Sequence, residues 1–182
     1  ALPISVFTVD HGEHLGQHGM YQKMEMYEPA LHVPLLMRVP GAGPARLHNP
    51  VSHLDVTPTL MDLFGMDSQT ELDGVSLAGC LREGEEPPAR TIFSQFSGNA
   101  EIGFLRRSAV TERYKYVYAP GEGRELFDLR EDPLEMRNLA GSAQHAETVE
   151  ELHRECAEWG SEHGDWVEFE INPNDEMRNS EF

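Results

Sequence analysis

The chain has 182 residues, of which 39% are hydrophobic, and this suffices for one ordinary domain or for one domain and part of another. Its 32 acidic residues against 14 basic ones give a formal net charge of -18, which argues against a nucleic-acid partner or an anionic membrane surface. No run approaches about eighteen apolar residues, so no membrane-spanning helix is expected.

Lysines are scarce in this sequence. Lys23 and Lys115 are the only two. An acidic surface with few lysines is typical of proteins from a high-salt cytoplasm, although ordinary acidic proteins also exist. A cytoplasmic, halophilic origin is therefore a hypothesis, and a structure that survives dilution into low salt would contradict it.

The first part of the chain predicts the end of an α/β sheet. Residues 4–9 (ISVFTV) are rich in β-branched side chains and indicate a short strand that is buried and parallel. A glycine-rich loop follows over residues 10–19, then a helix over 21–31 and a second apolar strand over 33–39. Strand, helical crossover and strand together form the βαβ pattern.

A further short helix is expected between residues 55 and 65. Asp55 stands at its N-cap, Pro58 lies in its first turn and Gly65 ends it. The predicted core face of this helix is Val56, Leu60, Leu63 and Phe64.

The composition changes after Glu83, where a polar linker with two prolines covers residues 84–90. Beyond the linker, alternation at period two predicts an antiparallel sheet with one face in solvent. The expected strands lie within residues 91–96, 103–111, 114–120 and 125–129. A helix over 149–159 would bury one stripe, made by Val149, Leu152, Cys156 and Trp159.

These elements predict three segments. Residues 1–83 would be part of an α/β domain, residues 84–161 a small α+β subdomain with an antiparallel sheet and a helix, and residues 162–182 an acidic tail.

Asp10 and His11 follow the first predicted strand directly. Open α/β sheets bind ligands at the carboxyl ends of their strands. A carboxylate suits Ca²⁺ or Mg²⁺, and a neighbouring imidazole widens the choice to Mn²⁺ or Zn²⁺. Taken alone, such a pair is more often a turn cap beside a half-buried histidine.

Two further side chains of the same loop are candidates. His14 and His18 would complete a zinc triad with His11 if the segment were helical, but its glycines disfavour a helix. Lys23 would clamp a sulfate or phosphate if it lay near a metal, whereas a lone lysine near a helix start is usually just solvated.

The order of these features resembles a family motif. The segment DHGEHLGQHGMYQKMEMYEPALHVPLLMRVPG (residues 10–41) is similar to S-D-H-G-E-x-L-G-x-H-G-L-x-x-K and Y-E-E-x-x-R-V-P-L-I-x-x-x-P-G of the sulfatase family. That family is formylglycine-dependent and belongs to the alkaline phosphatase-like superfamily. The similarity continues at residues 51–66, 73–84 and 115–140, and so covers about residues 4–140.

The resemblance implies the end of an alkaline phosphatase-like α/β/α sandwich, followed by the small α+β subdomain. It implies that Asp10 and His11 bind one divalent metal, most often calcium with magnesium or manganese as alternatives. Lys23 would contact the sulfate oxygens, and His18 matches the family's Gly-x-His-Gly as a further substrate-binding candidate. Asp55 matches a position whose expected role is structural, as a helix cap.

The sequence also departs from the family pattern. Val9 replaces a common serine before the aspartate, and His32 replaces an arginine before Val-Pro. The family's Asp-Asp metal pair and its C-x-P-S-R nucleophile motif are absent, and neither Cys80 nor Cys156 fits that motif. The chain therefore resembles the C-terminal portion of a sulfatase, and alone it is expected to be inactive.

The resemblance favours a sulfuric ester hydrolase that acts on a small sulfate ester together with an N-terminal half. Two alternatives stay open: a phosphonate or phosphate ester hydrolase of the same superfamily, and a non-catalytic sulfatase-like module. An interface left uncovered by an absent half would favour association, so an oligomer is among the expected states.

Overall fold

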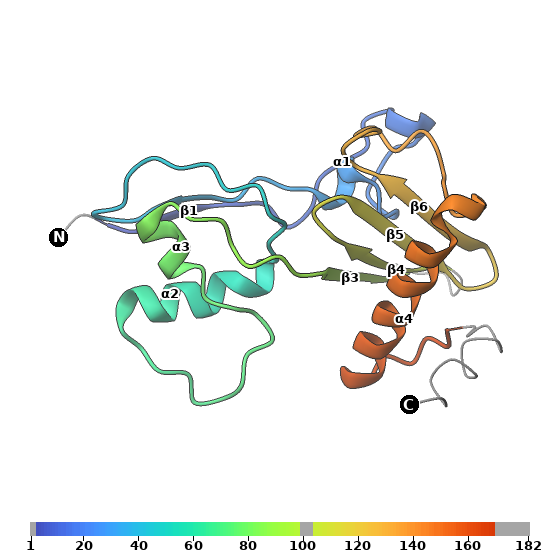
Figure 1. Cartoon of the computed structure of the whole chain (residues 1–182). Helices are drawn as coiled ribbons and strands as arrows, with labels where there is room; N and C mark the ends of the chain where they lie inside the picture. Colours follow the sequence, from blue (N-terminus) through green and yellow to red (C-terminus); the bar gives the residue numbers. More distant parts are fainter. Residues whose placement is uncertain (1–2, 99–103, 170–182) are drawn as a thin grey trace. The chain divides into compact units, whose positions relative to one another are not determined.

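A computed structural model describes residues 3–98 and 104–169 of the chain (Figure 1). The chain divides into two compact units. The first comprises Ala1–Lys23, Tyr27–Ile92 and Val110–Arg113, and the second comprises Met24–Met26, Phe93–Ala109 and Tyr114–Phe182. The domain boundary expected after residue 83 stays a prediction. Most of the predicted tail, residues 170–182, lies outside the described residues.

The first unit contains a small sheet of two strands, β1 (Ser5–Phe7) and β2 (Leu36–Arg38). They pair antiparallel, with Val6 opposite Met37. The parallel βαβ unit predicted for this part of the chain is therefore wrong.

The connection between the two strands explains the difference. The helix expected over residues 21–31 is present only as α1 (Glu28–Leu31), and the loop before it folds back on itself through a short 3-10 turn, η1 (Gln17–Gly19). A parallel pair needs a crossover of about a dozen residues or more, usually a helix. This chain turns back instead, and so the second strand runs against the first.

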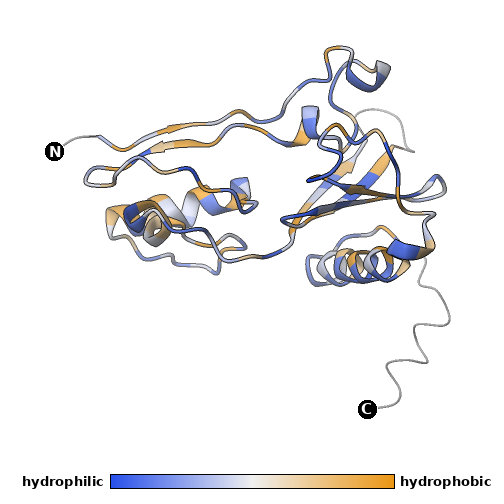
Figure 2. Cartoon of the chain, turned by 45° about the horizontal axis from the view of Figure 1, so that its top comes forward, coloured by the Kyte–Doolittle hydropathy of each residue, from blue (hydrophilic) through white to orange (hydrophobic). Residues whose placement is uncertain are grey.

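The predicted burial of the first strand is also wrong. Phe7 is 57% exposed, and Leu36 opposite it is 63% exposed. Figure 2 shows apolar colouring along both strands, although their outward side chains are open to solvent. Exposed apolar side chains of this kind are typical of a surface that another part of a protein covers.

The helix predicted near residue 60 is confirmed as α2 (Val56–Phe64), and it ends at Gly65 with a left-handed φ of 67°. Its predicted core face is only partly right, because Phe64 is 62% exposed and the one buried residue of the helix is Thr59. The Thr59 hydroxyl accepts a hydrogen bond from the amide of Leu77 at 2.9 Å, and this explains its burial. A second helix, α3 (Ala78–Glu83), follows.

Asp55 is fully buried and has a structural role different from the predicted one. Its carboxylate accepts hydrogen bonds from the backbone amides of Ser52 at 2.8 Å and Val75 at 2.9 Å, and it forms an ion pair with Arg90. It therefore completes a capping box with Ser52 on the 3-10 turn η2 (His53–Asp55). Although Asp55 precedes α2, its side chain makes no bond to that helix.

The second unit contains the predicted antiparallel sheet. Its strands are β3 (Ile92–Ser97), β4 (Leu105–Val110), β5 (Tyr114–Ala119) and β6 (Gly123–Asp128). They lie in the order β3-β4-β5-β6, and β5 pairs antiparallel with β6.

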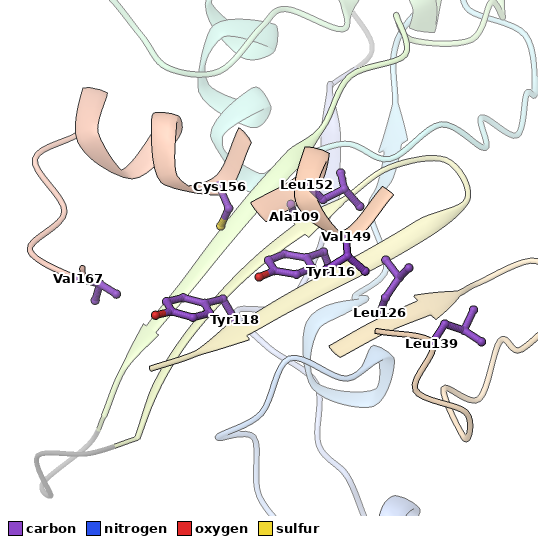
Figure 3. Packing of buried hydrophobic residues seen from close by; sticks show 9 residues of the cluster. All are labelled: Ala109, Tyr116, Tyr118, Leu126, Leu139, Val149, Leu152, Cys156 and Val167. Carbon is purple, nitrogen blue, oxygen red and sulfur yellow. The ribbon is translucent and has the colours of Figure 1, made fainter. Parts of the chain in front are cut away.

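A long helix, α4 (Ala146–Glu162), follows the 3-10 turn η3 (Ala143–His145) and packs on one face of this sheet. Figure 3 shows Val149, Leu152 and Cys156 of the helix above Tyr116 of β5. These helix positions are three of the four predicted, and the fourth, Trp159, is partly buried. Burial raises the pKa of the Cys156 thiol to about 12, so it stays protonated. None of the described helices combines the length and the apolar content that crossing a bilayer requires.

The opposite face of the sheet is buried as well, so the predicted solvated face is wrong. Side chains on a strand alternate between faces, and β5 buries Tyr116 on one side and Lys115 on the other. Lys115 pairs with the buried Glu135 at 2.8 Å, and Met26 contacts Ser108 of β4. Segments outside the sheet therefore cover the face that its alternation had assigned to water.

Candidate functional site

The loop that follows β1 closes on itself like a hairpin. The amide of His14 donates to the carbonyl of Gln22 at 3.0 Å, and that of Gly16 donates to Met20 at 2.8 Å. The Glu13 carboxylate also accepts the amide of Gln22. Because both legs are joined in this way, residue 23 returns to the start of the loop.

Gly12 anchors the base of this loop to α1. Its amide donates to the carbonyl of Ala30 at 2.8 Å. A Cβ at position 12 would lie 1.9 Å from the carbonyl oxygen of Pro29, which is far inside van der Waals contact. The close approach of these two backbones therefore requires glycine at this position.

Asp10, His11 and Lys23 meet at the mouth of the loop. The ammonium of Lys23 lies against the Nε2 atom of His11, and the Asp10 Oδ2 atom lies 3.4 Å from the same nitrogen. The other Asp10 oxygen accepts the His11 amide at 3.1 Å. The structure thus brings together the three side chains that the sequence singled out, whereas their chemical roles stay predictions.

The orientation of the His11 ring follows from its second nitrogen. The Nδ1 atom lies 2.7 Å from the carbonyl oxygen of Gly12, and only a protonated Nδ1 can donate to a carbonyl. The lone pair of the neutral ring is then on Nε2, beside Asp10 and Lys23. This arrangement is typical of metal-binding histidines, in which one ring nitrogen binds the metal and the other donates to a backbone carbonyl.

The donor set fits part of a metal shell. The side chain of Asp10 is 86% exposed and that of His11 is 36% exposed, so both are accessible to a cation. One carboxylate and one imidazole suit a divalent metal but leave most of its coordination positions open. In residues 3–98 and 104–169, no group of three or more His, Cys, Asp or Glu side chains is arranged to hold a metal ion.

The zinc triad of His11, His14 and His18 is therefore not formed. His18 has a left-handed φ of 55°, which breaks the helical spacing that the triad needs. Its ring stacks on Tyr27 with centroids 4.1 Å apart, and it meets His14 edge to face at 6.3 Å.

His14 is the most buried residue of the loop, with 1% of its surface exposed. Neither ring nitrogen has a hydrogen-bond partner among the described residues. Its ring lies edge to face with Tyr27 at 6.0 Å. Sequence reasoning found no role for His14 and missed Tyr27, because stacking between residues nine apart in an irregular loop leaves no periodic signal.

His32, which stands where the family has an arginine, does not join the site residues. Its Nδ1 atom lies 2.5 Å from the carboxylate of Glu28, one turn earlier in the chain. The side chain of His32 is 75% exposed.

A comparison with protein families matches residues 16–162 to the family described as N-sulphoglucosamine sulphohydrolase, C-terminal. A choline-sulfatase of Rhizobium meliloti (strain 1021) is 39% identical over 141 residues, which are 74% of this chain and 26% of that protein. Arylsulfatase K of Mus musculus is 39% identical over 154 residues, 75% of this chain and 27% of that protein. The chain thus spans about a quarter of the length of these curated relatives.

Solved structures show the same similarity. A 2-O GAG sulfatase has a TM-score of 0.79 at 28% identity, covering 94% of this chain and 39% of that chain. The phosphonate monoester hydrolase of Agrobacterium radiobacter has a TM-score of 0.74 at 28% identity, covering 88% of this chain and 35% of that chain.

Proposed function

This chain belongs to the sulfatase family, and on that premise we propose that it supplies the Asp10–His11 metal ligands and the anion-binding Lys23 of a sulfuric ester hydrolase. One observation carries the proposal. The carboxylate, the imidazole Nε2 atom and the ammonium converge at one point of an exposed loop mouth. A cation and a tetrahedral anion with negative oxygens need this combination of charges.

In this proposal Asp10 and His11 would hold one divalent cation, and the resemblance to the sulfatase family favours calcium over magnesium or manganese. When bound, such a cation would supply Lewis-acid polarisation of the sulfuryl oxygens. Since His11 Nε2 has a single lone pair, it would have to give up its contact with Lys23 to bind a metal. The Lys23 ammonium would then be available to donate to the sulfate oxygens and to neutralise the charge that develops during hydrolysis.

The remaining ligands and the formylglycine nucleophile are proposed to lie in an N-terminal half that this chain does not contain. We also propose His18, in the 3-10 turn η1, as a substrate-binding residue. The substrate class is a small sulfate ester.

The role of Lys23 can be tested in the complete sulfatase that contains this chain. We expect Lys23→Ala to lower kcat for an aryl sulfate by about a hundredfold or more, the effect of losing one partner of the developing negative charge. Arg154→Ala is the matched control, because it removes a cation from the exposed surface of α4. An unchanged kcat in Lys23→Ala would contradict the proposal.

A phosphonate or phosphate ester hydrolase is the second candidate function. The similarity to the phosphonate monoester hydrolase supports this candidate, since a cation and a lysine can bind either a sulfate or a phosphonate group. Comparing kcat/KM for an aryl sulfate and for a phosphonate monoester separates the two activities, and a higher value for the phosphonate would favour this candidate. If the complete protein hydrolyses no sulfate, phosphonate or phosphate ester, the third alternative, a non-catalytic module, is favoured.

We also propose a high-salt cytoplasm as the environment of this protein, on the grounds of its net charge of -18 and its two lysines. Loss of circular dichroism on dilution from high to low salt is the expected result. A stable spectrum throughout would remove the proposal without touching the activity.

A further inference from the structure

The three residues that follow Lys23 belong to the second unit. Met24–Met26 are part of the unit that contains the four-stranded sheet, while Lys23 is the last residue of the preceding segment of the first unit. The segment contains two side chains that reach β4. Glu25 contacts Arg106, and Met26 contacts Ser108.

Arg106 uses all of its N–H groups to hold this arrangement. Its Nε and one terminal nitrogen donate to the two carboxylate oxygens of Glu25 at 2.8 and 3.2 Å. Its terminal nitrogens also donate to both oxygens of Glu122 at 3.1 and 2.8 Å, and to the carbonyl of Leu105 at 3.0 Å. Five donors thus make five hydrogen bonds, in the planar fork that only arginine provides.

The pair is largely shielded from water. The side chain of Arg106 is 8% exposed and that of Glu25 is 22% exposed. Burial by itself would lower the pKa of Arg106, but the hydrogen bonds to Glu25 and Glu122 outweigh this and raise it. A buried pair of this geometry is screened little by salt, and removing either partner leaves the other charge uncompensated.

A second contact fixes the same segment. Met26 is 4% exposed, and its sulfur lies 3.7 Å from the hydroxyl of Ser108, which is fully buried. Arg106 and Ser108 are two residues apart on β4 and therefore point to the same face of the sheet. Two successive side chains of the segment are thus held by one strand.

We propose that Arg106 is a positioning residue for Lys23, which it fixes by fastening Glu25 to β4. The inference rests on the proposed function of Lys23. Lys23 is exposed, and its side chain has four rotatable bonds, so the place of its ammonium depends on where its backbone is held. Glu25 follows two residues later, and a small displacement at this point moves the ammonium away from the anion that it has to meet.

The test uses mild variants in the complete sulfatase. Arg106→Lys keeps the positive charge but loses the bidentate fork, and Glu25→Gln keeps the shape but loses the charge. Arg124→Lys is the matched control, because Arg124 lies on β6 and pairs with Glu150 of α4 at 2.7 Å.

The expected result has two parts. Arg106→Lys and Glu25→Gln each lower kcat by about tenfold with little change in KM, while Arg124→Lys changes kcat by less than about twofold. In a Lys23→Ala background, Arg106→Lys causes no further loss, because a positioning residue acts only through the residue that it positions. An equal loss with and without Lys23 would overturn the proposal.

Hydrogen exchange of the peptide spanning residues 23–27 provides a readout that does not need activity. The amides of this peptide should exchange about tenfold faster in Arg106→Lys and at the unaltered rate in Arg124→Lys. Unchanged exchange in Arg106→Lys would also overturn the proposal. If the unaltered protein hydrolyses no ester at all, the proposed function fails, and the exchange rates still decide whether Arg106 fastens the segment after Lys23.

Discussion

The two units of this chain bury their apolar residues in different ways. In the second unit, nine buried residues form one continuous core between the sheet and α4 (Figure 3). Among the described residues of the first unit, the buried hydrophobic ones are Ala30, Leu77 and Ala78. The first unit, which contains the candidate site, is therefore shaped mainly by backbone hydrogen bonds and buried polar groups. The second unit has a core of its own.

Breaking the buried Arg107–Asp165 ion pair of the second unit should have the largest effect. Arg107 is 1% exposed, and two of its nitrogens donate to the carboxylate of Asp165, one of them at 2.8 Å. We expect Asp165→Asn to lower the free energy of unfolding by about 3 to 5 kcal/mol, because a buried guanidinium loses its counter-charge. Urea unfolding followed by tryptophan fluorescence measures it, since both tryptophans, Trp159 and Trp166, lie in this unit.

The same pair predicts a pH dependence. The hydrogen bonds from Arg107 hold the pKa of Asp165 below its ordinary value of 3.8. The carboxylate therefore contributes stability that is fully present above pH 3.8 and is lost as the pH falls through the lower, folded value. Asp165→Asn should make the urea midpoint less dependent on pH in that acid range. An equally steep decline of the midpoint with falling pH in the variant would contradict this assignment.

The next largest effect is expected in the core of the second unit. Leu126 is fully buried among the core residues, and Leu126→Ala should cost about 2 to 5 kcal/mol through lost contacts and a cavity. The matched change in the first unit is Leu36→Ala, at a side chain that is 63% exposed, and it should stay within about 0.5 kcal/mol. Urea unfolding followed by circular dichroism measures the free energy of unfolding of both variants. Equal losses would remove the contrast between the units.

A smaller effect is expected from Gly12→Ala, which tests the backbone contact that shapes the site. The new Cβ would meet the Pro29 carbonyl, and the strain should cost about 1 to 3 kcal/mol, confined to the first unit. The measurement is hydrogen exchange over residues 10–31, with the core of the second unit as internal reference. Gly79→Ala is the control, because a Cβ there has open space, and normal exchange in Gly12→Ala would show that the loop does not need this approach.

The smallest effect is expected at Glu86, on the surface of the first unit. Hydrogen bonds from the amide and ring of His48 and from the amide of Asn49 lower the pKa of this carboxyl from 4.5 to about 2. Its contribution to stability is present above pH 4.5 and fades as the pH falls towards 2. An NMR titration should find this low pKa in the unaltered chain, while Glu86→Gln should lower the urea midpoint at neutral pH only slightly, because solvent screens this exposed carboxylate.

The sequence predicted the second unit better than the first, for a physical reason. The alternating residues of the four strands and the apolar stripe from Val149 to Trp159 reflect packing within this unit. These elements could therefore be predicted from local sequence patterns. The covered second face of the sheet was missed because it depends on Lys115 meeting Glu135 and on Met26 meeting Ser108. Such contacts join distant segments and leave no local pattern.

In the first unit, the apolar run of β1 predicted burial, yet Phe7 of this strand is 57% exposed. A sequence records that a strand is apolar and does not say which surface covers it. The meeting of Asp10, His11 and Lys23 was foreseen through the family motif. The Arg106–Glu25 pair was not, because its partners lie 81 positions apart.

The buried carboxylate of Asp55 also affects the loop between α2 and α3. Asp55 accepts the amide of Val75, twenty residues further on, and Gly74 crosses so closely that a Cβ there would lie 2.0 Å from the Leu54 carbonyl oxygen. The end of this loop is thus held against the segment that precedes α2, while residues 65–71 in the loop are all exposed. The entropic cost of closing a loop grows only slowly with its length. Residues 65–71 are therefore a suitable place to insert a tag or a longer specificity loop without disturbing the helices on either side.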